Sequence, residues 1–120
     1  AQDLTGDLQK DVEVINGIHF LAKKLDLNQN SIKDLAFELG NQIDNLFLLI
    51  GTESGEKAFL TCFISKNLVT EKQLNAGQVV RELGKIIQGG GGGQPFYATA
   101  GGKNPKGLDE ALEKGKQYIL

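Results

Sequence analysis

The stretch Gly89–Gly102, which reads GGGGGQPFYATAGG, holds seven of the sixteen glycines of this chain within fourteen residues. Glycine loses more backbone entropy on folding than any other residue, so a folded domain keeps so many only for a local reason. A flexible linker is one such reason, but the intervening QPFYATA lacks the composition of a linker. The stretch therefore indicates a loop whose bare backbone amides approach an anionic group such as a phosphate. The glycines assigned to this loop are Gly89, Gly90, Gly91, Gly92, Gly93, Gly101 and Gly102.

The charge pattern around these glycines favours the same interpretation. The chain of 120 residues has a formal net charge of −2, and its acidic residues lie mostly up to residue 71 and after residue 108. Between residues 78 and 107 the only acidic residue is Glu82, and the basic residues are Arg81, Lys85, Lys103 and Lys106. The first two are four residues apart, so they share the exposed face of a helix that leads into the glycines. A basic surface beside bare amides suits phosphate groups.

Interpretations of the same residues that involve no bound phosphate stay open. In one of them, Gly101 and Gly102 end a short strand and the five glycines before them are a flexible hinge. Phe96 is favoured as an anchor in the core, whereas Tyr97 is the better candidate for stacking on an unpaired base. If the glycine run faces solvent, a valine at Gly91 should block a phosphate and leave the fold intact.

The rest of the pattern predicts a mixed α/β domain, with helices packed on a small mixed β-sheet. Its order is strand, helix, strand, strand, helix, glycine loop, helix. The expected strands are Ile15–Leu25, Leu46–Ile50 and Lys57–Ser65. The expected helices run from an N-cap at Ser31 to Ile43, from Ala76 to Gln88 and from Leu108 to Leu120. Residues 1–13 are expected to end a preceding helical segment, and residues 14–120 to form one globular domain. Because the chain contains no methionine, we expect it to be a piece of a longer protein.

Few residues of this chain are suited to catalysis. One histidine, His19, and one cysteine, Cys62, are too few for a zinc site, which needs about four such ligands. Cys62 lies in the apolar string AFLTCFI and is expected in the core, and His19 is expected to be structural. No nucleophile motif or Walker motif is present. No apolar stretch approaches the twenty residues of a membrane span, and a single cysteine fits a cytoplasmic setting.

Three strings carry a resemblance to a known family: INGIHFLAKKL, NAGQVVRELGKIIQGGGGGQPFYATAGGKNP and GLDEALEKGK. They resemble the C-terminal domain of alanyl-tRNA synthetases, from about Glu13 to the end of the chain. The same domain type is similar to one found behind the catalytic part of DHH phosphoesterases. In those enzymes a histidine follows the glycine run, and many alanyl-tRNA synthetases carry arginine there. This chain has Gln94 at that position, which departs from both patterns.

The resemblance implies a non-catalytic domain that contacts the elbow of tRNA and supports both alanylation and editing by its parent enzyme. The parent would be an ATP-dependent alanine–tRNA ligase that uses ATP, magnesium and zinc, and this part would hold no cofactor of its own. The implied partners are alanine-specific tRNA and the remaining synthetase domains, with homodimer formation also possible and no membrane partner. The implied RNA-binding residues are those named above together with Gln94. Two rivals stay open, a substrate-binding domain of a DHH-type phosphoesterase and a dimerisation module.

Overall fold

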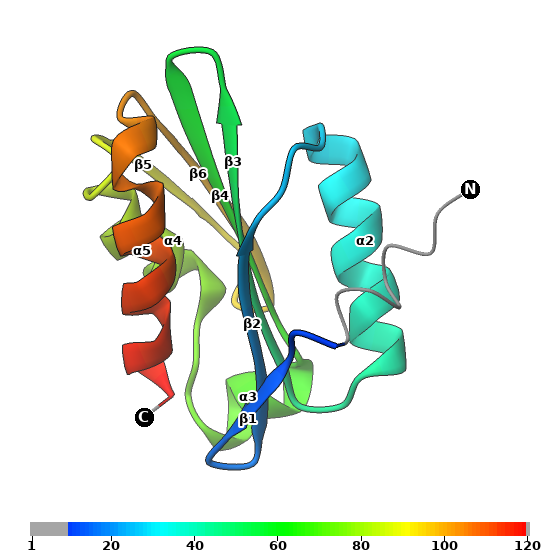
Figure 1. Cartoon of the computed structure of the whole chain (residues 1–120). Coiled ribbons are helices and arrows are strands. Elements are labelled where there is room, and N and C mark those ends of the chain that lie inside the picture. The colour runs from blue at the N-terminus through cyan, green and yellow to red at the C-terminus, as the bar shows by residue number, and fades with distance from the viewer. Residues whose placement is uncertain (1–9, 120) are drawn as a thin grey trace.

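The chain forms a six-stranded mixed β-sheet with helices on both faces (Figure 1). The computed structural model describes residues 10–119. The strands are β1 (Glu13–Ile15), β2 (Ile18–Lys24), β3 (Leu46–Ser54), β4 (Lys57–Ile64), β5 (Gly89–Gly93) and β6 (Tyr97–Gly102). The helices are α2 (Gln29–Gln42), α3 (Lys66–Glu71), α4 (Ala76–Gly84) and α5 (Leu108–Gly115), with short 3₁₀ helices at Pro105–Gly107 and Lys116–Tyr118. The strand order is β1-β2-β3-β4-β6-β5, and only β2 and β3 are parallel neighbours. The expected mixed α/β class is confirmed.

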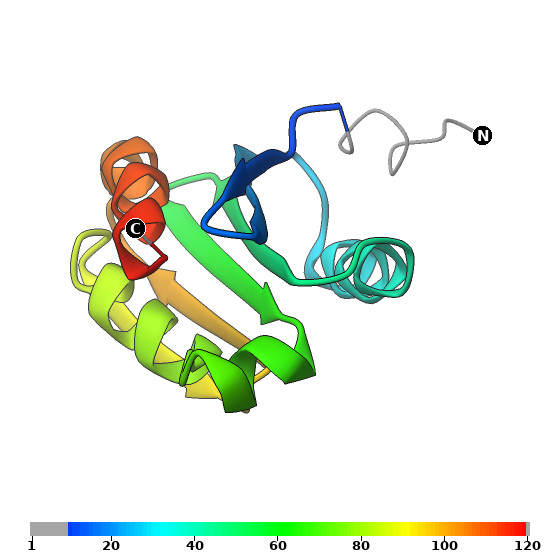
Figure 2. The same cartoon turned by 90° about the horizontal axis from the view of Figure 1, so that it is seen from below.

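Each face of the sheet has its own hydrophobic core. Helices α4 and α5 cover one face and α2 covers the other, as Figure 2 shows. Side chains alternate between the faces along a strand. In β4, for example, Leu60 and Cys62 pack beneath α4 and α5, whereas Phe63 packs with α2. Apolar residues on both faces make β3 and β4 continuous apolar runs, which is why the sequence predicted both strands, although β3 continues four residues past the expected end at Ile50.

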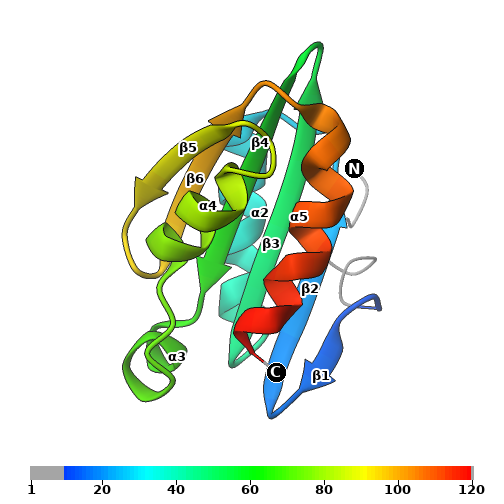
Figure 3. The same ribbon diagram turned by 90° about the vertical axis from the view of Figure 1, so that its left-hand side faces the viewer.

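The interpretation of Gly89–Gly93 as a loop is wrong. These residues form β5, which pairs antiparallel with β6 in a register that sets Gly91 opposite Ala100. Helix α4 lies directly against this strand (Figure 3). A Cβ added to Gly84 would lie 3.3 Å from the Cα of Gly90, so helix and strand meet almost backbone to backbone. The glycines therefore serve close packing, which composition alone did not reveal.

The expectation that a valine at Gly91 leaves the fold intact is wrong for the same reason. A Cβ built on Gly91 would lie 2.2 Å from the carbonyl oxygen of Thr99 and 2.4 Å from the Cα of Ala100. Both atoms belong to the backbone of β6, so neither can rotate away. The alternative interpretation is half right: Gly101 and Gly102 do end a short strand, β6, but the five glycines before them form the paired strand β5 and not a flexible hinge.

The N-terminal strand is shorter than expected and belongs to a hairpin. Asn16 and Gly17 both have positive φ, of 53° and 79°, and they join β1 to β2 as a two-residue turn. Asn-Gly between apolar residues is a strong hairpin signal that the prediction of one strand over Ile15–Leu25 overlooked. Most of the helical segment expected over residues 1–13 lies outside the described residues, and that expectation stays a prediction.

Helix boundaries also differ from the expected ones. Asn28, and not Ser31, caps α2, because its side-chain oxygen accepts a hydrogen bond of 2.8 Å from the backbone N–H of Ser31. Helix α3 was not expected. Helix α4 ends at Gly84, four residues early, and a tighter turn follows in which Ile87 donates to the carbonyl of Gly84. Helix α5 ends at Gly115 and continues as a 3₁₀ turn.

Asn75 fixes the start of α4, the helix that carries Arg81 and Lys85. Its side-chain oxygen accepts a hydrogen bond of 3.1 Å from the backbone N–H of Gln78. We expect Asn75→Ala to lower the free energy of unfolding by about 0.5–2 kcal/mol, as for other lost N-caps. Urea denaturation measures the change, and Asn75→Asp, which keeps the accepting oxygen, is the matched control. Equal stability of Asn75→Ala and the unaltered chain would contradict this role for the cap.

Candidate nucleic-acid interface

Strand β5 is the last strand of the sheet that the described residues form, so one of its edges is unpaired. Gln94 and Tyr97 exchange both backbone hydrogen bonds, at 2.8 and 3.3 Å, where β5 turns into β6. Antiparallel pairs alternate, so Gly90 and Gly92 turn their peptide groups toward β6. The peptide groups of the other three glycines turn outward. The outward N–H groups belong to Gly89, Gly91 and Gly93.

Helix α4 supplies cations along this edge. It runs antiparallel to β5, because a Cβ on Gly77 would lie 3.2 Å from the carbonyl oxygen of Gly93, whereas Gly84 lies against Gly90. The guanidinium of Arg81 lies 3.9 Å from the Cβ position of Gly92, near the C-terminal end of β5. Lys85 follows the last turn of α4 and is exposed. Arg81 and Lys85 therefore lie on one exposed side of α4, as predicted, and this side runs along β5.

Lys103 and Lys106 complete the basic surface at the start of β5. Lys103 directly follows β6. Lys106 lies in the 3₁₀ turn Pro105–Gly107, which packs on the turn that follows α4: a Cβ built on Gly107 would lie 2.4 Å from the carbonyl oxygen of Ile86. Both side chains are exposed. In the part of the chain that the structure describes, the ion pairs are formed by Lys23, Lys24, Lys114 and Lys116. Arg81, Lys85, Lys103 and Lys106, the four cations around β5, have no carboxylate partner among the described residues. We call them, with the outward glycine amides, the basic edge: Arg81, Lys85, Lys103, Lys106, Gly89, Gly91 and Gly93.

The two predicted RNA-binding residues that are neither cations nor glycines lie at the opposite end of β5 from Lys103. Gln94 is exposed and begins the turn between β5 and β6. Tyr97 is half-buried, its ring lies 5.4 Å from the ring of Phe37, and the Lys33 ammonium lies 6.0 Å from it. Burial raises the pKa of the Tyr97 phenol. Tyr97 therefore faces α2 and lies off the basic edge.

A hollow of about 330 Å³ adds two residues that the sequence did not suggest. Lys57 and Phe59 of β4 line it together with Gln88, Lys103 and the ends of β5 and β6. The register of β4 with β6 sets Phe59 opposite Gly101, and a Cβ on that glycine would lie 3.4 Å from the Phe59 ring. We call this space the basic hollow. Since Lys57 and Lys103 are 46 positions apart, no local spacing could have linked them.

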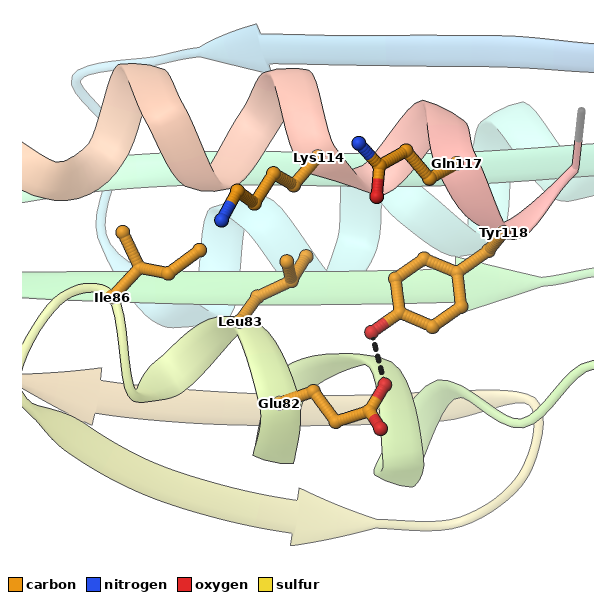
Figure 4. A pocket seen from close by; sticks show the side chains of 6 residues that line it. All are labelled: Glu82, Leu83, Ile86, Lys114, Gln117 and Tyr118. Carbon is orange, nitrogen blue, oxygen red and sulfur yellow. Dashed lines mark hydrogen bonds between the residues drawn. The ribbon is translucent and has the colours of Figure 1, made fainter.

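A second hollow, of about 440 Å³, lies between α4 and the C-terminal turn (Figure 4). Leu83 and Ile86 form its apolar wall, and the Tyr118 hydroxyl donates a hydrogen bond to the Glu82 carboxylate. Burial and this carboxylate raise the pKa of the Tyr118 phenol. The bond ties the C-terminal turn to α4, so it helps to hold the helix that carries Arg81.

The remaining reactive side chains are structural. His19 donates a hydrogen bond of 2.7 Å from Nδ1 to the backbone carbonyl of Asp44, which joins β2 to the end of α2. Cys62 is fully buried, and burial raises the pKa of its thiol. Within residues 10–119, no group of three or more His, Cys, Asp or Glu side chains is arranged to hold a metal ion. No helix in that range is long and apolar enough to cross a membrane.

Comparison with known proteins identifies the family. The model of the DHHA1 domain matches residues 17–120. The alanine–tRNA ligase of Christiangramia forsetii is 62% identical over 119 residues, which are 99% of this chain and 14% of the relative. The alanine–tRNA ligase of Bacteroides fragilis is 50% identical over 108 residues, 89% of this chain and 12% of the relative. The chain thus spans about one seventh or less of the length of these relatives.

Solved structures agree with the sequence comparison. The crystal structure of the C-Ala domain from Aquifex aeolicus alanyl-tRNA synthetase matches with a TM-score of 0.80 and 26% identity, covering 90% of this chain and 96% of that domain. A DHH-domain protein described as a member of a family of ribosomal proteins shares the fold, with a TM-score of 0.63 and 17% identity, covering 98% of this chain and 30% of that protein. The chain therefore belongs to the DHHA1 domain family and corresponds to the C-terminal, C-Ala domain of alanyl-tRNA synthetases.

Proposed function

We propose that this domain binds tRNA through the basic edge and so holds the tRNA for an alanine–tRNA ligase of which it is one part. The observation that carries the proposal is the juxtaposition of exposed cations without carboxylate partners and outward amides along β5. Cations neutralise phosphates and backbone N–H groups donate hydrogen bonds to phosphate oxygens, and neither contact depends on base sequence. The domain would therefore position the tRNA and leave its identity to be read elsewhere.

Catalysis would belong to the rest of the parent enzyme. The residues of the basic edge are cations and glycines, and they include no serine, cysteine, histidine or carboxylate to act as a nucleophile or a general base. ATP, magnesium and zinc would bind in other parts of the ligase. The high identity to alanine–tRNA ligases favours this parent over a DHH phosphoesterase.

Salt dependence of tRNA binding tests the proposal. We expect the domain to bind labelled tRNA with a dissociation constant of about 10⁻⁴ to 10⁻⁶ M near physiological salt, since the contacts are electrostatic. Fluorescence anisotropy over a salt series should give a logarithmic slope of about −2 to −4, one phosphate for each engaged cation. Binding that is absent even at low salt, or that ignores salt, would contradict the proposal.

A further inference from the structure

The face of the sheet that carries α2 is only partly covered. Helix α2 packs on β3 and β4, and it reaches β6 through the exposed ring of Phe37 on Tyr97. Figure 2 shows α2 on this face, with α4 and α5 on the other. Thr61 and Phe63 on β4 are buried, and the positions of this face on β4, β5 and β6 other than these two and Tyr97 are exposed or half-buried. Those positions are Lys57, Phe59, Gly90, Gly92, Thr99 and Gly101.

Aromatic residues gather on this open face. The chain has six phenylalanines and two tyrosines. Phe20 and Phe47 lie in the core of the opposite face, and Tyr118 lies beyond it on the C-terminal turn. The other five lie on or beside the open face: Phe37, Phe59, Phe63, Phe96 and Tyr97. Phe63 stands opposite Tyr97 and Phe59 stands opposite Gly101, so the aromatic positions follow the β4–β6 pair.

The open face ends in a hollow on each side. The basic hollow lies at the Phe59 end. At the other end, Phe37, Phe63 and Phe96 line a hollow of about 450 Å³, together with polar side chains that include Lys66 and Asn67. We call it the aromatic hollow. The Lys66 ammonium lies 5.4 Å from the centre of the Phe96 ring. Phe59 and Phe63 are four residues apart along β4, so the hollows are separated by about 13 Å.

We propose that this face binds unpaired RNA nucleotides, with one base stacked on Phe59 in the basic hollow and another held by Phe37 and Phe96 in the aromatic hollow. The inference rests on the proposed RNA-binding function and adds a second contact surface to it. Lys57, Lys66 and Lys103 would neutralise the phosphates that join the stacked nucleotides. An exposed sheet face with aromatic side chains is a physical basis for holding splayed bases.

Charge and shape favour RNA over a protein segment on this face. The chain has no acidic residue between Glu82 and Asp109, the segment that includes β5 and β6. Asp44 is the one carboxylate among the described residues that line the two hollows. Between the hollows lie the backbone of Gly90 and Gly92, the half-buried Thr99 and the Arg81 guanidinium, 3.9 Å from the Cβ position of Gly92. Apart from Gly90 and its chain neighbours, no heavy atom of the described residues lies within 4 Å of the Cβ position of Gly90. A planar base can lie flat there, and the cations around this surface favour the phosphates of RNA over an uncharged protein segment.

Binding of a single-stranded RNA octamer containing 2-aminopurine tests the proposal, with a blunt RNA duplex of the same length for comparison. We expect stacking to quench the 2-aminopurine fluorescence on binding to the unaltered chain. Phe59→Leu and Phe37→Leu should each weaken binding of the single strand about fivefold or more, the effect of losing one stacked base, and reduce the quenching. Duplex binding, which depends on the basic edge, should not change.

Two control variants make the result specific. Phe59→Tyr keeps an aromatic face and should restore both affinity and quenching. Val14→Ala removes an exposed apolar side chain from β1, at the other end of the sheet, and should leave single-strand binding unchanged. Phe37 is exposed, so its variant tests the proposal even if Phe59→Leu lowers stability.

The contrary outcomes are distinct from one another. If both leucine variants bind and quench like the unaltered chain, the open face does not hold bases, although duplex binding would still support the basic edge. If the unaltered chain binds neither RNA, the proposed function itself fails. If sedimentation shows that the chain self-associates and Phe37→Leu abolishes this, the face belongs to a second copy and the RNA proposal is overturned.

Discussion

Gly91→Ala is expected to destabilise the domain by about 3 kcal/mol or more, and Gly91→Val to prevent folding. The added Cβ would lie 2.2 Å from the carbonyl oxygen of Thr99, inside the backbone of β6. Relief would require β5 to separate from β6, which would break the backbone pairing of the two strands. Thermal unfolding followed by circular dichroism should show the melting temperature of Gly91→Ala lowered by about 10 °C or more.

Gly90→Ala is the matched control one residue away. No heavy atom of the described residues lies within 4 Å of its Cβ position, and its φ is outside the left-handed region. We expect this variant to be neutral or more stable by about 0.4–1 kcal/mol, because alanine restricts the unfolded chain. Equal effects at the two positions would show that the glycine run is a flexible segment, the alternative that the composition left open.

The double variant Lys85→Glu/Lys103→Glu is expected to weaken tRNA binding about tenfold or more at low salt and to reduce the salt slope by about two. Each substitution replaces a cation of the basic edge by a charge that repels phosphate. Both side chains are exposed and unpaired among the described residues, so the free energy of unfolding should change by about 0.5 kcal/mol or less at each site. Fluorescence anisotropy with labelled tRNA measures the affinity.

Lys23→Glu/Lys24→Glu provides a control with the same change in net charge. Both lysines lie on β2, which β3, β4 and β6 separate from β5, and they pair with Asp11 and Glu53. If tRNA responds only to total charge, this variant should weaken binding as much as the first one. We expect a much smaller loss, because the phosphates would contact the other end of the sheet.

The sequence was sufficient to predict the elements that bury apolar side chains. The apolar runs that became β3 and β4, and the stripe of Val79, Val80 and Leu83 in α4, carry their own periodicity. Strand β5 carries none, because glycine has no side chain to alternate, and its conformation is imposed by β6 and α4. The hairpin at Asn16 and Gly17 had a readable signal that was outweighed by the apolar pattern around it.

The sequence likewise predicted only some residues of the candidate site. Arg81 and Lys85 were found because helical spacing places them on one exposed face, and the structure sets that face along the glycines. Lys57 and Phe59 were missed because only the pairing of β4 with β6 brings them to Lys103 and Gly101. Tyr97 was singled out as a candidate for stacking on an unpaired base, but strand alternation turns its ring toward α2 and away from the basic edge.

Titration of the ¹⁵N-labelled domain with unlabelled tRNA, followed by amide NMR spectra at low salt, tests most directly whether RNA binds at the basic edge. The outward N–H groups of Gly89, Gly91 and Gly93 should show some of the largest shift changes, together with the amides of Arg81 and Lys103. Added salt should reverse these changes as the tRNA is released. Shift changes confined to β1, β2 and α5, with the glycine amides unmoved at saturating tRNA, would contradict binding at this edge.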